Sequence, residues 1–253
     1  EAVKHGTVVI DNTSHFRMVK DIPLVVPEVN GHVLKTHKGI IANPNCSTAQ
    51  LVLILKPIHD AARIKRVVVS TYQSTSGWGR EAVEELYNQT KAVMAGEKPS
   101  VNTNILPKQI AFNLIPQIDQ FTDNGYTKEE LKMTNETRKI LGDESIMLTA
   151  TTVRVPVKIG HSEAVNIVTE KKLTADEVRK LIAKVPTVVV MDDPKNKVYP
   201  TPLECEGKNE TFVGRIREDI SHPNGIDLWV VSDNLRRGAA FNAVMIAEEM
   251  IRQ

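Results

Sequence analysis

The stretch "IIANPNCSTAQLVLILKPIHDAA", residues Ile40 to Ala62, joins a short apolar run to an apolar helix through an Asn-Pro-Asn turn. The residue before a proline avoids the helical region, so the turn predicts a helix that begins at or near Cys46. The Cys46 sulfur would then lie close to unpaired backbone N–H groups, which favour thiolate over thiol. The same pattern also suits a cysteine that only packs as a small apolar side chain.

Strand and helix patterns alternate on both sides of this stretch, which favours an α/β or α+β architecture. The segment "IKRVVVSTYQ", residues 64–73, predicts a strand, and its valine run is typical of a sheet covered on both faces. The segment "IMLTATTVRVPVKIGHSEAVNIVTE", residues 146–170, predicts two long strands joined at Gly160. Further helices are predicted over residues 80–96, 127–142, 174–185 and 238–252. In the second of these, Thr127 is the predicted N-cap and Gly142 the predicted end. Further strands are predicted over residues 7–10, 40–42, 211–219 and 226–234.

Composition indicates a soluble protein. The 253 residues allow a sizeable core, in one large domain or two modest ones, and the contents of 41% hydrophobic and 25% charged residues are ordinary. A net charge of +1 without long runs of one sign argues against a nucleic-acid surface or a membrane patch. No apolar stretch reaches the roughly 18 residues of a membrane span. Two cysteines make no metal cluster or disulfide framework, so we expect the reducing cytoplasm as the compartment and no metal.

A reactive cysteine usually needs an imidazole nearby. Among the 7 histidines, His161 follows Gly160 at the expected joint between two strands, where a side chain can project into a cleft. The second cysteine, Cys205, lies between Glu204 and Glu206. Their charges raise the pKa of its thiol, and we assign it no catalytic role.

Other charged residues could bind a ligand. Arg154 lies inside the apolar run "TTVRVPV" and therefore needs an anionic partner, either in a structural ion pair or in a substrate. Glu129 and Lys132 share one face of a predicted helix, and the spacing alone favours a solvated surface pair. Arg17 is a lone cation in a polar loop, and the glycines of "STSGWG", residues 74–79, could bring the backbone close to a ligand.

Seven stretches follow one another along nearly the whole chain: "VVIDNTSHFRM", "PLVVPEVN", "IIANPNCSTAQL", "TYQSTSGWG", "EELKMTNETRKIL", "VRVPVKIGHSEAVN" and "SDNLRRGAA". Taken together and in this order, they resemble aspartate-semialdehyde dehydrogenase. The resemblance implies a glyceraldehyde-3-phosphate-dehydrogenase-like plan, with an α/β Rossmann NADP-binding domain followed by an α+β catalytic and dimerisation domain. Residues 1–45 would be the C-terminal part of the NADP-binding domain, residues 46–233 the catalytic and dimerisation domain, and residues 234–253 a helix packing back on the first. A homodimer or homotetramer is implied.

The same resemblance implies the reaction and its residues. Aspartyl 4-phosphate would be reduced by NADPH, reversibly, to aspartate 4-semialdehyde and phosphate, on the route to diaminopimelate, lysine, threonine and methionine. The implied roles are Cys46 as nucleophile, His161 as acid/base, Gln73 as the group that orients the intermediate, Arg154 and Glu129 for the substrate α-carboxylate and α-ammonium, Lys132, Arg17 and Asn45 for the phosphate, and Ser76, Gly77, Trp78 and Asn234 near the nicotinamide of NADP.

Two features depart from the family pattern. The chain has no Gly-rich turn to bind a pyrophosphate, so we expect an N-terminally incomplete chain that binds NADP poorly and turns over slowly or not at all. Micromolar NADP binding in isothermal titration would contradict this expectation. Trp78 stands where a small residue is expected near the nicotinamide, and it either reshapes that pocket or points away from it.

Three other functions remain open on the sequence. N-acetyl-glutamyl-phosphate reductase shares the plan and the cysteine chemistry, but its acylated substrate amine does not need Glu129. A non-catalytic fragment or oligomerisation core is the second, and it predicts equal labelling of Cys46 and Cys205 by iodoacetamide, whereas an activated Cys46 would react much faster below about pH 8. A Cys/His hydrolase is the third, although Gln73 and Arg154 give it no obvious substrate.

Overall fold

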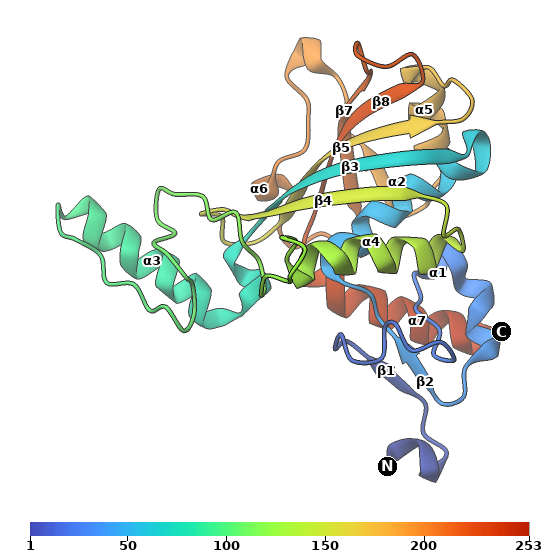
Figure 1. Cartoon of the computed structure of the whole chain (residues 1–253), viewed down its shortest axis with the longest axis horizontal. Helices are drawn as coiled ribbons and strands as arrows, with labels where there is room; N and C mark the ends of the chain where they lie inside the picture. The colour runs from blue at the N-terminus through green and yellow to red at the C-terminus, as the bar shows by residue number, and fades with distance from the viewer. Residues whose placement is uncertain (253) are drawn as a thin grey trace.

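The computed structural model describes residues 1–252, which contain a two-stranded parallel sheet and a six-stranded mixed sheet (Figure 1). The strands are β1 (Val9–Asp11), β2 (Ile40–Ala42), β3 (Ile64–Gln73), β4 (Met147–Arg154), β5 (His161–Thr169), β6 (Val188–Val190), β7 (Thr211–Glu218) and β8 (Gly225–Ser232). The α-helices are α1 (Pro27–Asn30), α2 (Cys46–Ala62), α3 (Arg80–Met94), α4 (Lys128–Leu141), α5 (Ala175–Ile182), α6 (Pro202–Cys205) and α7 (Phe241–Arg252).

The large sheet has the order β4-β3-β5-β8-β7-β6. Strand β3 lies between β4, to which it is parallel, and β5, to which it is antiparallel. The prediction of two strands over residues 146–170 is therefore confirmed, but β4 and β5 are not neighbours. The chain crosses the end of β3 between them, with Gly160 in the left-handed region at φ +99°.

Helices α2, α4 and α5 cover one face of this sheet and bury the main hydrophobic core against it. Along β3 the buried residues alternate with half-exposed ones, so Val67 and Val69 lie in the core while Val68 and Tyr72 face the other side. These helices cover one face of β3, and the other face is half-exposed within residues 1–252, so the chain by itself does not cover both faces as predicted.

The C-terminal helix packs against the N-terminal part of the chain. Helix α7 lies beside β1 and β2 in Figure 1, and Ile246 packs with Val25, Leu34 and Ile41 in a separate small core. The predicted helix start at Gly238 is corrected, because a π-helical turn over Arg236–Ala240 precedes α7. No helix within residues 1–252 has the length and apolar character needed to cross a membrane.

Helix α3 and the long loop after it form an arm that projects from the sheet, to the left in Figure 1. A small cluster that includes Ala82, Leu86 and Ile110 packs the loop against α3. The Gln89 side chain, itself buried, accepts from the backbone N–H groups of Ile110 and Ala111, which fixes the loop. The loop then returns to the sheet before α4 begins.

Helix α4 begins and ends where the sequence predicts. Thr127 and Glu130 form a capping box at its start, and Gly142 ends it in the left-handed conformation. Both ends have their backbone groups bound, so α4 is a rigid support for the side chains it carries.

Candidate active site

A cavity of about 360 Å³ opens where the N-terminus of α2, the end of β3, α4 and the π-helical turn meet. It brings together side chains from distant parts of the sequence. All but one of the residues predicted for the site line it, namely Cys46, Gln73, Arg154, Glu129, Lys132, Arg17, Asn45, Ser76, Gly77, Trp78 and Asn234. The exception is His161, which is fully buried and lies next to this cavity behind Gly77.

Cys46 is the first residue of α2, as predicted. The Asn45 side chain accepts from the backbone N–H groups of Ser47 and Thr48, at 3.0 and 3.2 Å, and so caps the helix. The Asn45 amide also donates to the Glu129 carboxylate at 2.9 Å. The helix N-terminus therefore already has an acceptor, and the Cys46 sulfur receives less of its positive potential than the sequence alone suggests.

The surroundings of Cys46 favour the protonated thiol. Burial, followed by the charge of Glu129, raises its pKa to about 12, against the opposing effects of Arg154 and Arg17. Burial likewise raises the pKa of Cys205 to about 12, with smaller raising effects from Glu204 and Asp233. The expectation that the helix N-terminus favours the Cys46 thiolate is therefore wrong, because burial and Glu129 outweigh it. The predicted direction for Cys205 is confirmed, although burial is its main cause.

Replacing Glu129 with glutamine is expected to speed the alkylation of Cys46 by iodoacetamide several-fold at neutral pH. The Glu129 carboxylate raises the pKa of the thiol, so its removal lowers that pKa and increases the thiolate fraction. Below the pKa, the rate should rise about tenfold per pH unit in both proteins. Mass spectrometry of the Cys46 peptide measures the rate. Cys205, whose thiol does not respond to Glu129, is the internal control, and an unchanged Cys46 rate would contradict the prediction.

His161 is held in one orientation by Ser74. Its Nδ1 accepts from the Ser74 backbone N–H at 3.1 Å and lies 3.2 Å from the Ser74 hydroxyl. The neutral ring therefore has its proton on Nε2, and burial together with the Arg154 charge keeps the pKa of His161 well below its usual value. Nε2 has no hydrogen-bond partner among the described residues. A Cβ on Gly77 would lie 3.0 Å from this atom, so a larger residue at position 77 would press on the His161 ring.

Arg154 is a buried cation without a carboxylate partner in residues 1–252. Its side chain donates from Nη1 to the Ser74 carbonyl at 2.7 Å, and the residue is 3% exposed. The Arg154 side chain also lines the cavity. Of the two possibilities for Arg154, the structural ion pair is wrong, because no acidic side chain in this part of the chain lies within ion-pair distance of the guanidinium.

Glu129 and Lys132 are not the solvated surface pair that their spacing suggested. Glu129 is 5% exposed. Lys132 donates to Asp119 at 2.8 Å and lies 3.4 Å from Glu129, so its ammonium is held between two carboxylates. Sequence reasoning missed Asp119, which comes from the arm loop and carries no motif around it.

Arg17 lies on the other side of the cavity and is also almost buried. Its guanidinium donates to the Asn43 carbonyl at 2.9 Å, to the Asn12 carbonyl at 2.9 Å and to the Glu136 carboxylate at 3.1 Å. The solvated loop cation expected from the sequence pattern alone is therefore wrong. Glu136 was also missed, although its position seven residues after Glu129 places it on the same helix face.

The residues predicted for the nicotinamide lie beside His161. The Asn234 side-chain oxygen accepts from the Ser74 and Ser76 hydroxyls and from the Gly160 N–H, at 3.0, 3.2 and 2.9 Å. Trp78 is 48% exposed and lines both this cavity and a neighbouring one, so it forms part of the cavity mouth. Gly238 is required by close packing, since a Cβ there would lie 2.5 Å from the Cys46 Cβ.

Comparisons with known proteins identify the family. The sequence profile of "Semialdehyde dehydrogenase, dimerisation domain" matches residues 55–237, and that of "Semialdehyde dehydrogenase, NAD binding domain" matches residues 1–37. The chain is 55% identical over 252 residues to the "Aspartate-semialdehyde dehydrogenase" of Aquifex aeolicus, a match that covers 99% of this chain and 74% of that protein. The chain belongs to the aspartate-semialdehyde dehydrogenase family. It is an oxidoreductase of aspartate-pathway amino-acid biosynthesis with aspartate-semialdehyde dehydrogenase activity.

Solved structures of aspartate-semialdehyde dehydrogenases have the same fold. The chain resembles aspartate semialdehyde dehydrogenase II of Vibrio cholerae complexed with ASA, with a TM-score of 0.96 and 50% identity, over 100% of this chain and 74% of that one. It also resembles the aspartate semialdehyde dehydrogenase with NADP from Candida albicans, with a TM-score of 0.74 and 27% identity, over 99% and 72% of the two chains. These matches confirm the predicted plan of a nucleotide-binding segment followed by a mixed-sheet dimerisation domain.

Proposed function

We propose that Cys46 accepts the aspartyl group of aspartyl 4-phosphate during the dehydrogenase reaction. The observation that carries this proposal is the cavity itself, which gathers one thiol, buried cations and a buried carboxylate around a space of about 360 Å³. The Cys46 sulfur would attack the acyl carbon and the carbon–oxygen bond to phosphate would break. Because the pKa of the thiol is about 12, its proton is still bound when the reaction starts, and it would end on the released hydrogen phosphate.

The buried charges would select an α-amino acid. Arg154 has no carboxylate partner in the described part of the chain, and its planar guanidinium would bind the substrate α-carboxylate in bidentate fashion. Glu129 would take the α-ammonium, whose charge would offset the smaller of the two effects that raise the pKa of Cys46, the larger being burial. Lys132, Arg17 and Asn45 would surround the phosphate. An N-acetylated substrate would bring no ammonium to Glu129, and the buried carboxylate would keep Lys132, at 3.4 Å, as its only cation within residues 1–252, so this assignment disfavours N-acetyl-glutamyl phosphate.

His161 would stabilise the negative charge that develops on the reacting oxygen, and it would serve as the acid/base. Its Nε2–H would donate to the oxygen of the tetrahedral adduct on Cys46. When Nε2 acts instead as a base, the ring would carry its proton on Nδ1, the Ser74 hydroxyl at 3.2 Å would accept a hydrogen bond from that N–H, and the hydrogen bond from the Ser74 backbone N–H to Nδ1 would be lost. Gln73, whose amide lies 3.3 Å from the Glu129 carboxylate, would orient the thioacyl group.

We propose NADP as the cofactor, within a family whose N-terminal domain binds NAD. When bound, it would supply the hydride that reduces the thioacyl carbon. Gly77 fits its nicotinamide end because only a residue without a Cβ leaves room next to Arg154 and His161. Ser76 and Asn234 would offer a hydroxyl and an amide to the nicotinamide carboxamide, and Trp78 would lie at the edge of the ring.

We propose the domain division given by the resemblance, with residues 1–45 and 234–253 on the nucleotide side and residues 46–233 forming the catalytic and dimerisation domain. The half-exposed face of β3 and its neighbours would pair with a second copy of the chain. Sedimentation velocity on the purified chain distinguishes a dimer or tetramer from a monomer.

An acylation experiment tests the proposed chemistry without any nucleotide. The purified chain is mixed with aspartyl 4-phosphate, released phosphate is counted, and the Cys46 and Cys205 peptides are examined by mass spectrometry. We expect one phosphate per chain and an aspartyl thioester on Cys46, with Cys205 unmodified and N-acetyl-glutamyl phosphate unreactive. Phosphate release without a thioester, or equal modification of both cysteines, would overturn the proposal.

A further inference from the structure

Helix α4 carries four charged residues on one face, at positions 129, 132, 136 and 139. The first two line the cavity and have roles in the proposed function. Glu136 and Lys139 do not line it, yet both bind Arg17, which does. Their contacts therefore act on the site through another residue.

Glu136 is 1% exposed, and its two oxygens bind different parts of the site. Oε1 accepts from Nη1 of Arg17 at 3.1 Å. Oε2 accepts from the backbone N–H of Asn45 at 2.7 Å, directly before the nucleophile. One carboxylate thus fixes the Arg17 guanidinium relative to the start of α2, and a buried charge in this position is costly unless both contacts persist.

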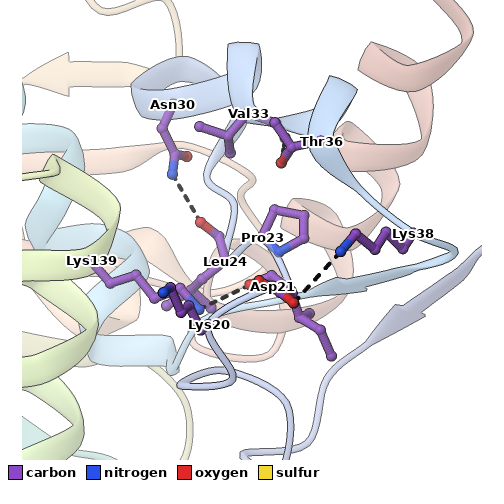
Figure 2. A pocket seen from close by; sticks show the side chains of 10 residues that line it. Lys20, Asp21, Pro23, Leu24, Asn30, Val33, Thr36, Lys38 and Lys139 are labelled. Atoms are coloured by element: carbon purple, nitrogen blue, oxygen red, sulfur yellow. Dashed lines mark hydrogen bonds and ion pairs between the residues drawn. The ribbon is translucent and has the colours of Figure 1, made fainter.

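Lys139 binds the backbone on the other side of Arg17. Its ammonium donates to the carbonyls of Arg17, Val19 and Ile22 at 2.7, 2.8 and 2.9 Å. Figure 2 shows its side chain reaching from α4 into this loop, at the wall of a separate surface cavity of about 380 Å³. All its donors bind loop carbonyls, so Lys139 fixes the loop rather than offering a free cation.

We propose that Glu136 and Lys139 are positioning residues that clamp Arg17, the first by its guanidinium and the second by its carbonyl, so that its free N–H donors face the phosphate beside Cys46. The guanidinium donates to Asn43, Asn12 and Glu136 and still has N–H groups at Nη1 and Nη2 for a ligand. A planar donor set of this kind is useful to a phosphate only when its plane is fixed. This inference rests on the proposed assignment of Arg17 to phosphate.

A mutant cycle with inorganic phosphate tests the clamp. Titration followed by ³¹P NMR gives the dissociation constant of phosphate for the wild-type chain and for Arg17→Met, Glu136→Gln and Lys139→Met. We expect Arg17→Met to weaken binding about 30-fold, since it removes charge-assisted hydrogen bonds. Glu136→Gln keeps an acceptor for the Asn45 N–H but presents an amide to Arg17, and we expect it to weaken phosphate binding about tenfold. Lys139→Met should weaken phosphate binding about fivefold.

The decisive comparison is made in the Arg17→Met background. If both residues act through Arg17, adding Glu136→Gln or Lys139→Met to Arg17→Met causes no further loss. Additive losses, or wild-type affinity in Glu136→Gln, would overturn the clamp while leaving phosphate binding intact. Absence of phosphate binding by the wild type would instead reject the assignment of Arg17 and the clamp with it.

The charge-matched control is Glu144→Gln, which removes an exposed carboxylate just after α4. Glu136→Asp, which keeps the charge but has a shorter reach, replaces Glu136→Gln if thermal melting shows that variant unfolded.

Discussion

Replacement of Cys46 with serine is expected to slow acyl transfer from aspartyl 4-phosphate by about four orders of magnitude or more, the scale seen when a covalent nucleophile is removed. A serine hydroxyl needs a strong base to attack. His161 offers none in the tautomer that Ser74 favours, because its Nε2 carries the proton and burial holds the pKa of the ring well below its usual value. Single-turnover phosphate release measures the effect.

The other cysteine provides the matched control. Cys205 is buried against Phe212 and Val231, away from the cavity, so Cys205→Ser should acylate at the wild-type rate after any change in stability is accounted for. If the Cys46→Ser chain kept substantial activity, the nucleophile would have to be another group. If Cys205→Ser lost activity without unfolding, the assignment of the two thiols would be reversed.

The second large effect concerns Arg154. Replacing it with methionine is expected to reduce the second-order rate of acylation by about 10²–10³, because the substrate α-carboxylate would lose a bidentate, charge-assisted pair in a buried site. Most of the loss should appear in substrate affinity. Lysine at this position restores the charge but not the planar pair of N–H donors, so Arg154→Lys should recover only a small part of the lost acylation rate.

An exposed arginine makes the control for this change. Arg80, at the start of α3, pairs with Glu84 on the surface and its side chain is 88% exposed, so Arg80→Met should leave acylation unchanged. Acylation by a substrate analogue without the α-carboxylate should be equally slow in the wild type and in Arg154→Met. A difference between them would show that Arg154 acts on the reacting group instead.

Local sequence signals predicted the helices well where capping chemistry decides the boundary. Helix α2 begins at Cys46 because Asn45 caps it, and α4 lies between the capping box of Thr127 and the left-handed Gly142. The pairing of strands was harder, because nothing within residues 146–170 reveals that β3 inserts between β4 and β5. Such pairing depends on contacts with a segment far away in the sequence.

The predicted site residues came from the family resemblance, and most of them line one cavity. The charges around them could not be predicted in the same way. Asp119 reaches Lys132 only because a long loop folds back, and the pKa of Cys46 depends on burial and on Glu129, neither of which a linear pattern reveals. Helical spacing could have placed Glu136 on the same face of α4 as Glu129, but spacing alone does not distinguish a buried residue from a solvated one.

The single helix face shared by Glu129, Lys132, Glu136 and Lys139 also limits how the chain can change in length. One inserted residue within α4 would rotate everything after it by roughly 100°, which would turn the later charges away from Arg17 while the earlier ones stayed in the site. The arm loop between α3 and α4 can absorb insertions, since it already departs from the sheet and returns. We therefore expect relatives of this chain to differ in length in the arm and to keep the spacing of α4 unchanged.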